Sequence, residues 1–150
     1  MSLHYYFAYG SNMDGHRLQV RVGDFPEPVA AQLDRYALHF NKIAKDKPGV
    51  GYANIVPAPN DRVEGVCYSL TPSQLEKLDK CEGAPGHYRR ENVKILINGH
   101  PKKAITYVAC AEQCAEGLLP ERSYLNHLLK GKPFLSAGYY ARLLRLGTQD

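Results

Sequence analysis

An aromatic, β-prone run spans residues 3–9 and stops abruptly at Gly10-Ser11-Asn12. Aromatic side chains suit a pleated, half-buried surface, so the run is predicted to be a strand. Glycine adopts backbone angles that are closed to other residues, and Ser and Asn support tight turns through local hydrogen bonds. The pattern alone is explained by a strand and a turn. The alternative is that the backbone N–H groups of this turn converge on a carboxylate or an oxyanion.

Further strands are predicted at 29–40, 52–56, 63–70, 88–97 and 103–109, where apolar residues recur with short spacing. Asn98-Gly99 is the strongest hairpin signal in the chain and joins the last two of these strands. The proline-containing segment 57–61 is expected to separate the strands on either side of it. The polar, basic segment 41–51 is expected to be a loop, because it contains Pro48-Gly49. Gly65, inside a strand, indicates a bulge or a close backbone approach.

Short helices are predicted at 14–22, 72–81, 121–129 and 137–146. The second of them has the best-defined start. Thr71 is a suitable N-cap, Pro72 occupies the first helical position, and Gln74 lies three residues after the cap. This helix is expected to end before the turn 82–86, because two glycines and a proline there prevent its continuation.

The order of these elements predicts the fold class. Five or six short strands are interspersed with short helices, and they do not follow strict βαβ alternation. That arrangement is typical of an α+β fold on a mixed or antiparallel, closed sheet. The 150 residues fit one domain, 1–150, and the chain shows no internal repeat.

Composition narrows the class of protein. Hydrophobic residues make up 44% of the chain and charged residues 23%, as in ordinary soluble proteins. The net charge is +4, but Lys and Arg are scattered. Only 42–47 and 102–103 approach a basic cluster, and both are expected to be solvated loops. Nucleic-acid binding, which needs a basic stripe or patch, is therefore not expected.

The cysteines and the apolar segments bear on metal binding and location. Cys67, Cys81, Cys110 and Cys114 form no Cys-x-x-Cys pair, so no metal site is expected. No signal peptide and no run of 18 or more apolar residues is present, so no membrane partner is expected. The default location is the cytoplasm, with free thiols.

Glu82 is the carboxylate best placed for chemistry. It follows the expected end of a helix and precedes a Gly-Ala-Pro-Gly turn. A carboxylate at such a junction can be held over a cavity, partly desolvated, with its pKa above the usual value of about 4.3. The alternative is an exposed loop residue. Tyr88, Tyr107 and Tyr124 could donate hydrogen bonds to a pocket or belong to the core. Ser11 has no evident His and Asp partners, which disfavours a serine hydrolase.

Four segments together resemble one known family. The stretch 6–13, with the sequence YFAYGSNM, resembles the N-terminal signature of the gamma-glutamylcyclotransferase-like family. Residues 63–70 resemble its central strand, and 78–83 (LDKCEG) resemble the helix end that carries its catalytic glutamate. Tyr88-Arg89-Arg90 follows at nearly the expected distance. The motif Tyr-Gly-Ser-Asn resembles that of the gamma-glutamylcyclotransferase branch. The resemblance spans about residues 5 to 147.

The resemblance implies a fold, an activity and a site. It implies a small mixed, partly closed β-barrel with flanking short helices, no cofactor, and a cavity at the end of the first strand. Members cyclise gamma-glutamyl compounds and release 5-oxoproline and a free amine. By resemblance, Glu82 is the general acid and base. The substrate-binding residues it implies are Tyr9, Gly10, Ser11, Asn12, Tyr88 and Tyr124. Glu82 should then face the N–H groups of residues 10–12 across a cavity sized for one gamma-glutamyl group.

Three matters stay open at this stage. The turn 83–88 is about one residue shorter than in the vertebrate enzymes and 110–121 aligns poorly, so the leaving group is not assigned. A homodimer is left open. A non-catalytic barrel that binds a small carboxylate, with a regulatory role, is the competing function, and a basic barrel that binds nucleic acid is a third.

Overall fold

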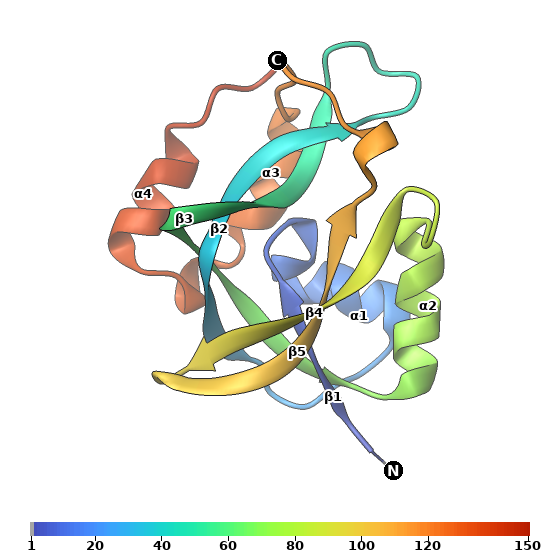
Figure 1. The fold of residues 1–150 in the computed structure, drawn as a ribbon, viewed down its shortest axis with the longest axis vertical. Coiled ribbons are helices and arrows are strands. Elements are labelled where there is room, and N and C mark those ends of the chain that lie inside the picture. The colour runs from blue at the N-terminus through green and yellow to red at the C-terminus, as the bar shows by residue number, and fades with distance from the viewer. Residues whose placement is uncertain (1) are drawn as a thin grey trace.

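A computed structural model describes residues 2–150, and its centre is a closed barrel of five strands (Figure 1). The strands are β1 (His4–Ala8), β2 (Val29–Ile43), β3 (Gly51–Leu70), β4 (Tyr88–Ile97) and β5 (His100–Ala109). They lie in the order β1-β3-β2-β4-β5, and β1 closes the barrel by pairing parallel to β5. The other pairs are antiparallel. The α+β class with a small mixed barrel is confirmed, and the barrel is fully closed.

Four short helices flank the barrel: α1 (Gly15–Val22), α2 (Pro72–Glu82), α3 (Arg122–Leu129) and α4 (Ala137–Leu144). Three 3-10 turns accompany them: η1 (Ser11–Met13), η2 (Ala111–Gln113) and η3 (Lys132–Phe134). Helix α1 packs on α2, while α3 packs on α4 and on η1 (Figure 1). The capping box expected at Thr71 and Gln74 is present. In the described part of the chain, no helix is long and apolar enough to cross a membrane.

The segment 51–70 was predicted to be two strands, and that prediction is wrong. It is one strand, β3, paired with β2 along most of its length. The register shifts where Arg35, with φ 68°, lies between Asp34, opposite Arg62, and Tyr36, opposite Pro57. An irregularity of this kind places prolines at exposed positions, where they interrupt no required ladder hydrogen bond.

The basic segment 42–47 was predicted to be a solvated loop, which is wrong for Lys42. This residue belongs to β2, opposite Tyr52, and only 4% of it is exposed. Its ammonium lies 6.0 Å from the ring centroid of Tyr52 and 5.8 Å from that of Tyr88, an arrangement that favours a buried cation. Lys102 and Lys103 are likewise in a strand, β5, although they are exposed.

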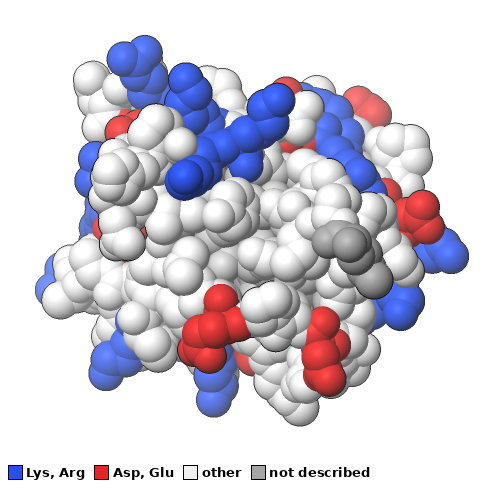
Figure 2. Space-filling model, turned by 90° about the horizontal axis from the view of Figure 1, so that it is seen from below, with Lys and Arg blue, Asp and Glu red and all other residues white. Residues whose placement is uncertain are grey.

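Charge on the face at the N-terminal end of β1 is discontinuous. Figure 2 shows Lys, Arg, Asp and Glu side chains around the rim of a mostly uncharged centre. A nucleic-acid site requires a continuous basic stripe or patch. On this face the Lys and Arg side chains gather at the edge, with acidic side chains beside them, and form no stripe across its centre.

The first strand is buried on both sides and therefore fixes the turn that follows it. Tyr6 and Ala8 belong to the core cluster under the helices, whereas Phe7 and Tyr9 belong to the cluster inside the barrel. Successive side chains of a strand point to opposite faces, so a short strand can join two cores. The chain beyond Ala8 leaves the barrel at one defined place.

We predict that Gly65→Ala destabilises the protein by about 1–3 kcal/mol, the usual cost of overpacking. The close approach expected at this glycine is present, because a Cβ there would overlap the carbonyl oxygen of Ala8. Gly138→Ala is the matched control, since its added Cβ meets no atom within 4 Å apart from its chain neighbours and the backbone of its own helix. Urea unfolding measures both. Equal stabilities of Gly65→Ala and the wild type would contradict the close packing of β1 on β3.

Candidate active site

Two adjacent cavities lie at the end of β1. The inner one has a volume of about 30 Å³, and the outer one about 560 Å³. All seven residues predicted for the site line the inner cavity: Tyr9, Gly10, Ser11, Asn12, Glu82, Tyr88 and Tyr124. Ser11, Glu82, Tyr88 and Tyr124 also line the outer cavity, so the two spaces share a wall. Residues that are far apart in the sequence thus meet at one place.

The turn after β1 is held by buried polar contacts. Tyr68 Oη donates a hydrogen bond of 2.7 Å to the carbonyl oxygen of Asn12, and Tyr9 Oη donates to that of Tyr107. Ser11 and Asn12 begin η1, where the first N–H groups have no partner inside the turn itself. Gly10 is tightly enclosed, since a Cβ there would lie 3.1 Å from the Cβ of Ala53. The turn therefore presents backbone donors beside the inner cavity.

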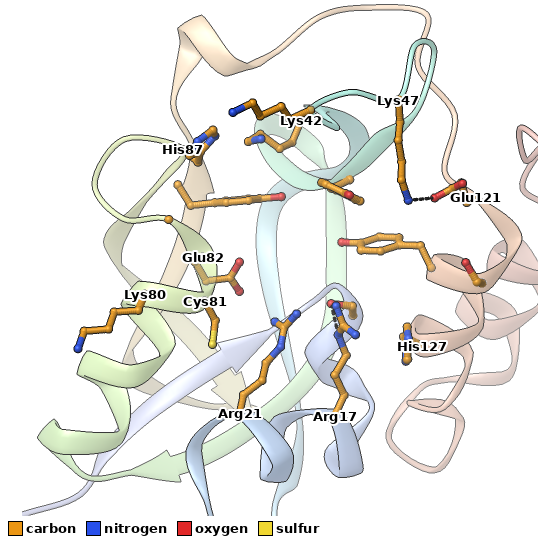
Figure 3. A pocket seen from close by; sticks show the side chains of 17 residues that line it. Arg17, Arg21, Lys42, Lys47, Lys80, Cys81, Glu82, His87, Glu121 and His127 are labelled. Carbon is orange, nitrogen blue, oxygen red and sulfur yellow. Dashed lines mark hydrogen bonds and ion pairs between the residues drawn. The ribbon is translucent and has the colours of Figure 1, made fainter.

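Glu82 is the last residue of α2, one residue nearer the helix than predicted. The helix ends because Gly83 adopts the left-handed conformation, with φ 65°, which glycine tolerates best. The side chain of Glu82 then enters the cavity (Figure 3). Asn12 Nδ2 donates to Glu82 Oε1 at 3.3 Å. The carboxylate and the turn after β1 are thereby in direct contact.

Burial raises the pKa of Glu82 above its ordinary value. The residue as a whole is half-buried, but its carboxyl group is enclosed, and desolvation disfavours the charged form. The positive charges of Arg21, Arg17 and Lys42 act in the opposite direction and limit the rise in pKa. Such a carboxyl group is suited to both accepting and releasing a proton.

Two arginines that sequence reasoning missed form the floor of the outer cavity. Arg17 and Arg21 lie four residues apart on α1 and rise side by side toward its centre (Figure 3). Arg17 Nε donates to Ser11 Oγ at 3.1 Å, and Arg21 Nη1 donates to Asn12 Oδ1 at 3.2 Å. Their helical spacing, directly after the turn, was the signal that could have identified them.

Two tyrosines that were predicted for the site form hydrogen bonds to the backbone of the same residue of β3. Tyr88 Oη donates to the carbonyl oxygen of Ala53 at 2.7 Å, and Tyr124 Oη accepts from the N–H of Ala53 at 3.1 Å. Burial raises the pKa of Tyr124 to about 12 and also raises that of Tyr88. Both phenols therefore stay protonated at neutral pH. Because Tyr124 uses an acceptor position for Ala53, its own O–H remains able to donate.

Tyr107 lines the inner cavity and anchors the end of α2. Its hydroxyl donates to Asp79 Oδ1, and Arg90 binds both carboxylate oxygens of Asp79 at 2.8 Å. A bidentate pair of this kind fixes orientation as well as distance. Within residues 2–150, no group of three or more His, Cys, Asp or Glu is placed to hold a metal ion.

Comparison with known proteins identifies the family of this chain. A family profile described as gamma-glutamyl cyclotransferase, AIG2-like, matches residues 6–126. The chain belongs to this family of enzymes. It is 37% identical over 131 residues to gamma-glutamylcyclotransferase from Bos taurus, an alignment that covers 84% of the chain and 68% of the relative.

Solved structures of family members have the same fold. A gamma-glutamyl cyclotransferase is 28% identical with a TM-score of 0.85, covering 99% of this chain and 90% of that one. YkqA from Bacillus subtilis is 26% identical with a TM-score of 0.85, covering 99% of this chain and 56% of that one. The chain spans between 43% and 68% of the length of the curated relatives it matches.

We predict that Glu82→Gln is more stable than the wild type at neutral pH. Glu82 has a higher pKa folded than unfolded, so stability falls as pH rises from the unfolded value, about 4.3, through the folded one. The amide has no such penalty. Urea unfolding at pH 7.5 and pH 4 measures the difference, which should shrink at the lower pH. A variant that is less stable at pH 7.5 would contradict the raised pKa.

Proposed function

We propose that this protein converts a gamma-glutamyl amino acid or amine into 5-oxoproline and a free amine, with Glu82 as general acid and base. The observation that carries the proposal is the single cavity shared by Glu82 and the turn at residues 10–12, linked by the contact from Asn12. A proton carrier and a set of donors on one cavity are the parts that acyl transfer requires.

The reaction is favoured because its nucleophile belongs to the substrate. The α-amine of a gamma-glutamyl group is already tethered to the γ-carbonyl carbon that it attacks. The protein then needs to fold the substrate into a ring-closing conformation. In well-held intramolecular reactions, orientation contributes up to about 7–11 kcal/mol. Tyr88 and Tyr124, each fastened to Ala53, provide rigid walls for that purpose.

Glu82 carries one proton in two directions. Its carboxylate takes a proton from the substrate ammonium, and the free amine attacks the γ-carbonyl carbon to form a new C–N bond. The oxyanion that develops there accepts hydrogen bonds from N–H groups of residues 10–12, or these N–H groups hold the substrate carboxylate. The bond to the leaving amine then breaks as Glu82 returns the proton to that nitrogen, and the ring nitrogen loses its second proton to the released amine, which departs as an ammonium ion. General acid–base catalysis of this type contributes roughly 10²–10⁴-fold.

The inner cavity accommodates only part of the substrate. A single water needs about 10–15 Å³, so 30 Å³ is sufficient for a small polar group and too small for a gamma-glutamyl group. The expectation of one cavity sized for that group therefore needs correction. The substrate would place one polar end in the inner cavity, and the rest would lie between Glu82 and Tyr124 in the outer one.

The basic floor of the cavity also favours a second candidate function. Arg17 and Arg21 could hold a small carboxylate without any turnover, as a regulatory barrel would. The presence of a buried, ionisable Glu82 in the same cavity favours catalysis, because simple carboxylate binding gains nothing from a second carboxylate nearby. Turnover measurements separate the two functions.

We predict that Glu82→Gln lowers the rate of 5-oxoproline formation by about 10²–10⁴-fold, because the amide cannot carry the proton. The measurement is release of 5-oxoproline from a panel of gamma-glutamyl amino acids and amines. Glu76→Gln is the matched control, since Glu76 lies on the exposed side of the same helix. Full activity of Glu82→Gln would overturn the assignment, and an inactive wild type on every substrate would favour the binding module.

We predict that Arg21→Met moves the acid limb of the pH–rate profile to higher pH. Among the positive charges that lower the pKa of Glu82, that of Arg21 has the largest effect, so its removal raises that pKa further. Fewer molecules would then hold the carboxylate form at a given pH. Arg145→Met, outside the cavity lining, serves as control. An acid limb that stays in place in Arg21→Met would mean that another group sets it.

A further inference from the structure

The outer cavity is more basic than ring closure requires. The cationic side chains that line it include Arg17, Arg21, Lys42, Lys45 and Lys47, and the lining carboxylates are Glu82 and Glu121. Glu121 is already bound to Lys47 at 2.9 Å. Lys80 also lines the cavity, but its side chain extends away from the centre (Figure 3). Positive charge therefore remains in excess inside a concave site, which concentrates anions.

Lys42 is the buried member of this cluster. It is 4% exposed, and its ammonium donates to the carbonyl oxygen of Ile43 at 2.8 Å. Among residues 2–150, no carboxylate lies at ion-pair distance from Lys42, Arg17 or Arg21. Burial lowers the pKa of Lys42, and the attraction of nearby groups, Glu82 among them, offsets the loss of water only in part. Buried charges in proteins are normally paired, so an arriving anion would supply what this site lacks.

The cations surround the cavity from two sides. Arg17 and Arg21 rise from α1 beside Glu82, whereas Lys42 and Lys47 enter from the opposite side (Figure 3). A gamma-glutamyl group is a zwitterion whose ammonium and carboxylate balance each other. Placed against Glu82 and the turn at residues 10–12, it leaves the charge on the lysine side unmatched. With the gamma-glutamyl group bound in this way, the lysine side is the part of the cavity left for the leaving amine.

We propose that the outer cavity selects gamma-glutamyl compounds whose leaving amine carries two negative charges, and that Lys42 binds the second charge. This inference rests on the proposed function. Two kinds of leaving amine carry two negative charges, a dicarboxylic amino acid and a phosphorylated amine. A cationic leaving amine is rejected by the same side chains, since like charges that meet in a cavity repel.

The test compares substrates that differ in charge at similar shape. We expect kcat/KM for gamma-glutamyl-glutamate to exceed that for gamma-glutamyl-glutamine by about tenfold, above the few-fold value of an exposed ion pair. The ratio of kcat/KM for gamma-glutamyl-phosphoethanolamine to that for gamma-glutamyl-ethanolamine tests a phosphorylated amine in the same way. The pair with the larger ratio shows whether the second charge is a carboxylate or a phosphate. N-(gamma-glutamyl)-putrescine, whose leaving amine carries a positive charge and no carboxylate, should be the poorest substrate. Ratios near one in both pairs would overturn the inference.

Two variants assign the effect to Lys42. Lys42→Met keeps the unbranched shape of the side chain, one atom shorter, and removes its charge, so the preference for glutamate over glutamine should fall to about one. Lys77→Met, outside the cavity lining, should keep the preference. If circular dichroism shows that Lys42→Met is unfolded, Lys45→Gln replaces it, with a partial loss expected. An unchanged preference in the folded variant would overturn the role of the lysine.

A separate outcome distinguishes failure of the proposed function from failure of the charge selection. If no substrate yields 5-oxoproline, the proposed reaction fails, and calorimetric titration of the wild type with the same dipeptides then tests the charge selection alone. A dissociation constant about tenfold lower for the glutamate than for the glutamine dipeptide would support it, weakening as salt screens the charges. Equal dissociation constants would overturn it.

Discussion

The candidate site depends on the hydrogen bonds of one buried amide, that of Asn12. Only 3% of this residue is exposed, and a buried amide must be satisfied. Its Oδ1 accepts from Arg21, its Nδ2 donates to Tyr6 Oη and to Glu82, and its backbone carbonyl accepts from Tyr68. These contacts join β1, α1, β3 and the end of α2, so the positions of the donors and of the carboxylate are set together.

Opposing electrostatic effects act on the same cavity. Enclosure raises the pKa of Glu82, and the cations of α1 and β2 keep that rise limited. The charge arrangement costs stability, as functional sites often do, because a buried carboxylate and an unpaired Lys42 are both less favourable than apolar residues there. The rigid pair of tyrosines on Ala53 gives these charges a fixed frame. A ligand that matches the excess positive charge would relieve part of the cost.

Local signals in the sequence were sufficient to predict much of the fold. The hairpin turn formed at Asn98-Gly99, both with positive φ, and the capping box formed at Thr71, because these depend on nearby residues alone. Glu82 and the turn after β1 were identified largely through family resemblance. Arg17, Arg21 and Lys42 were missed, since their roles depend on the close approach of α1 and β2 to one cavity. The single strand β3 was missed because its prolines lie at a register shift.

A crystal structure of Glu82→Gln with bound gamma-glutamyl-glutamate tests the central claim most directly. That claim is that residue 82 and the turn at residues 10–12 act on the same gamma-glutamyl group. The account predicts that the α-amine of the ligand lies about 2.6–3.2 Å from the side chain of residue 82. A carboxylate or γ-carbonyl oxygen of the ligand should accept from backbone N–H groups of the turn. A ligand whose γ-carbonyl carbon lies away from both would contradict the account.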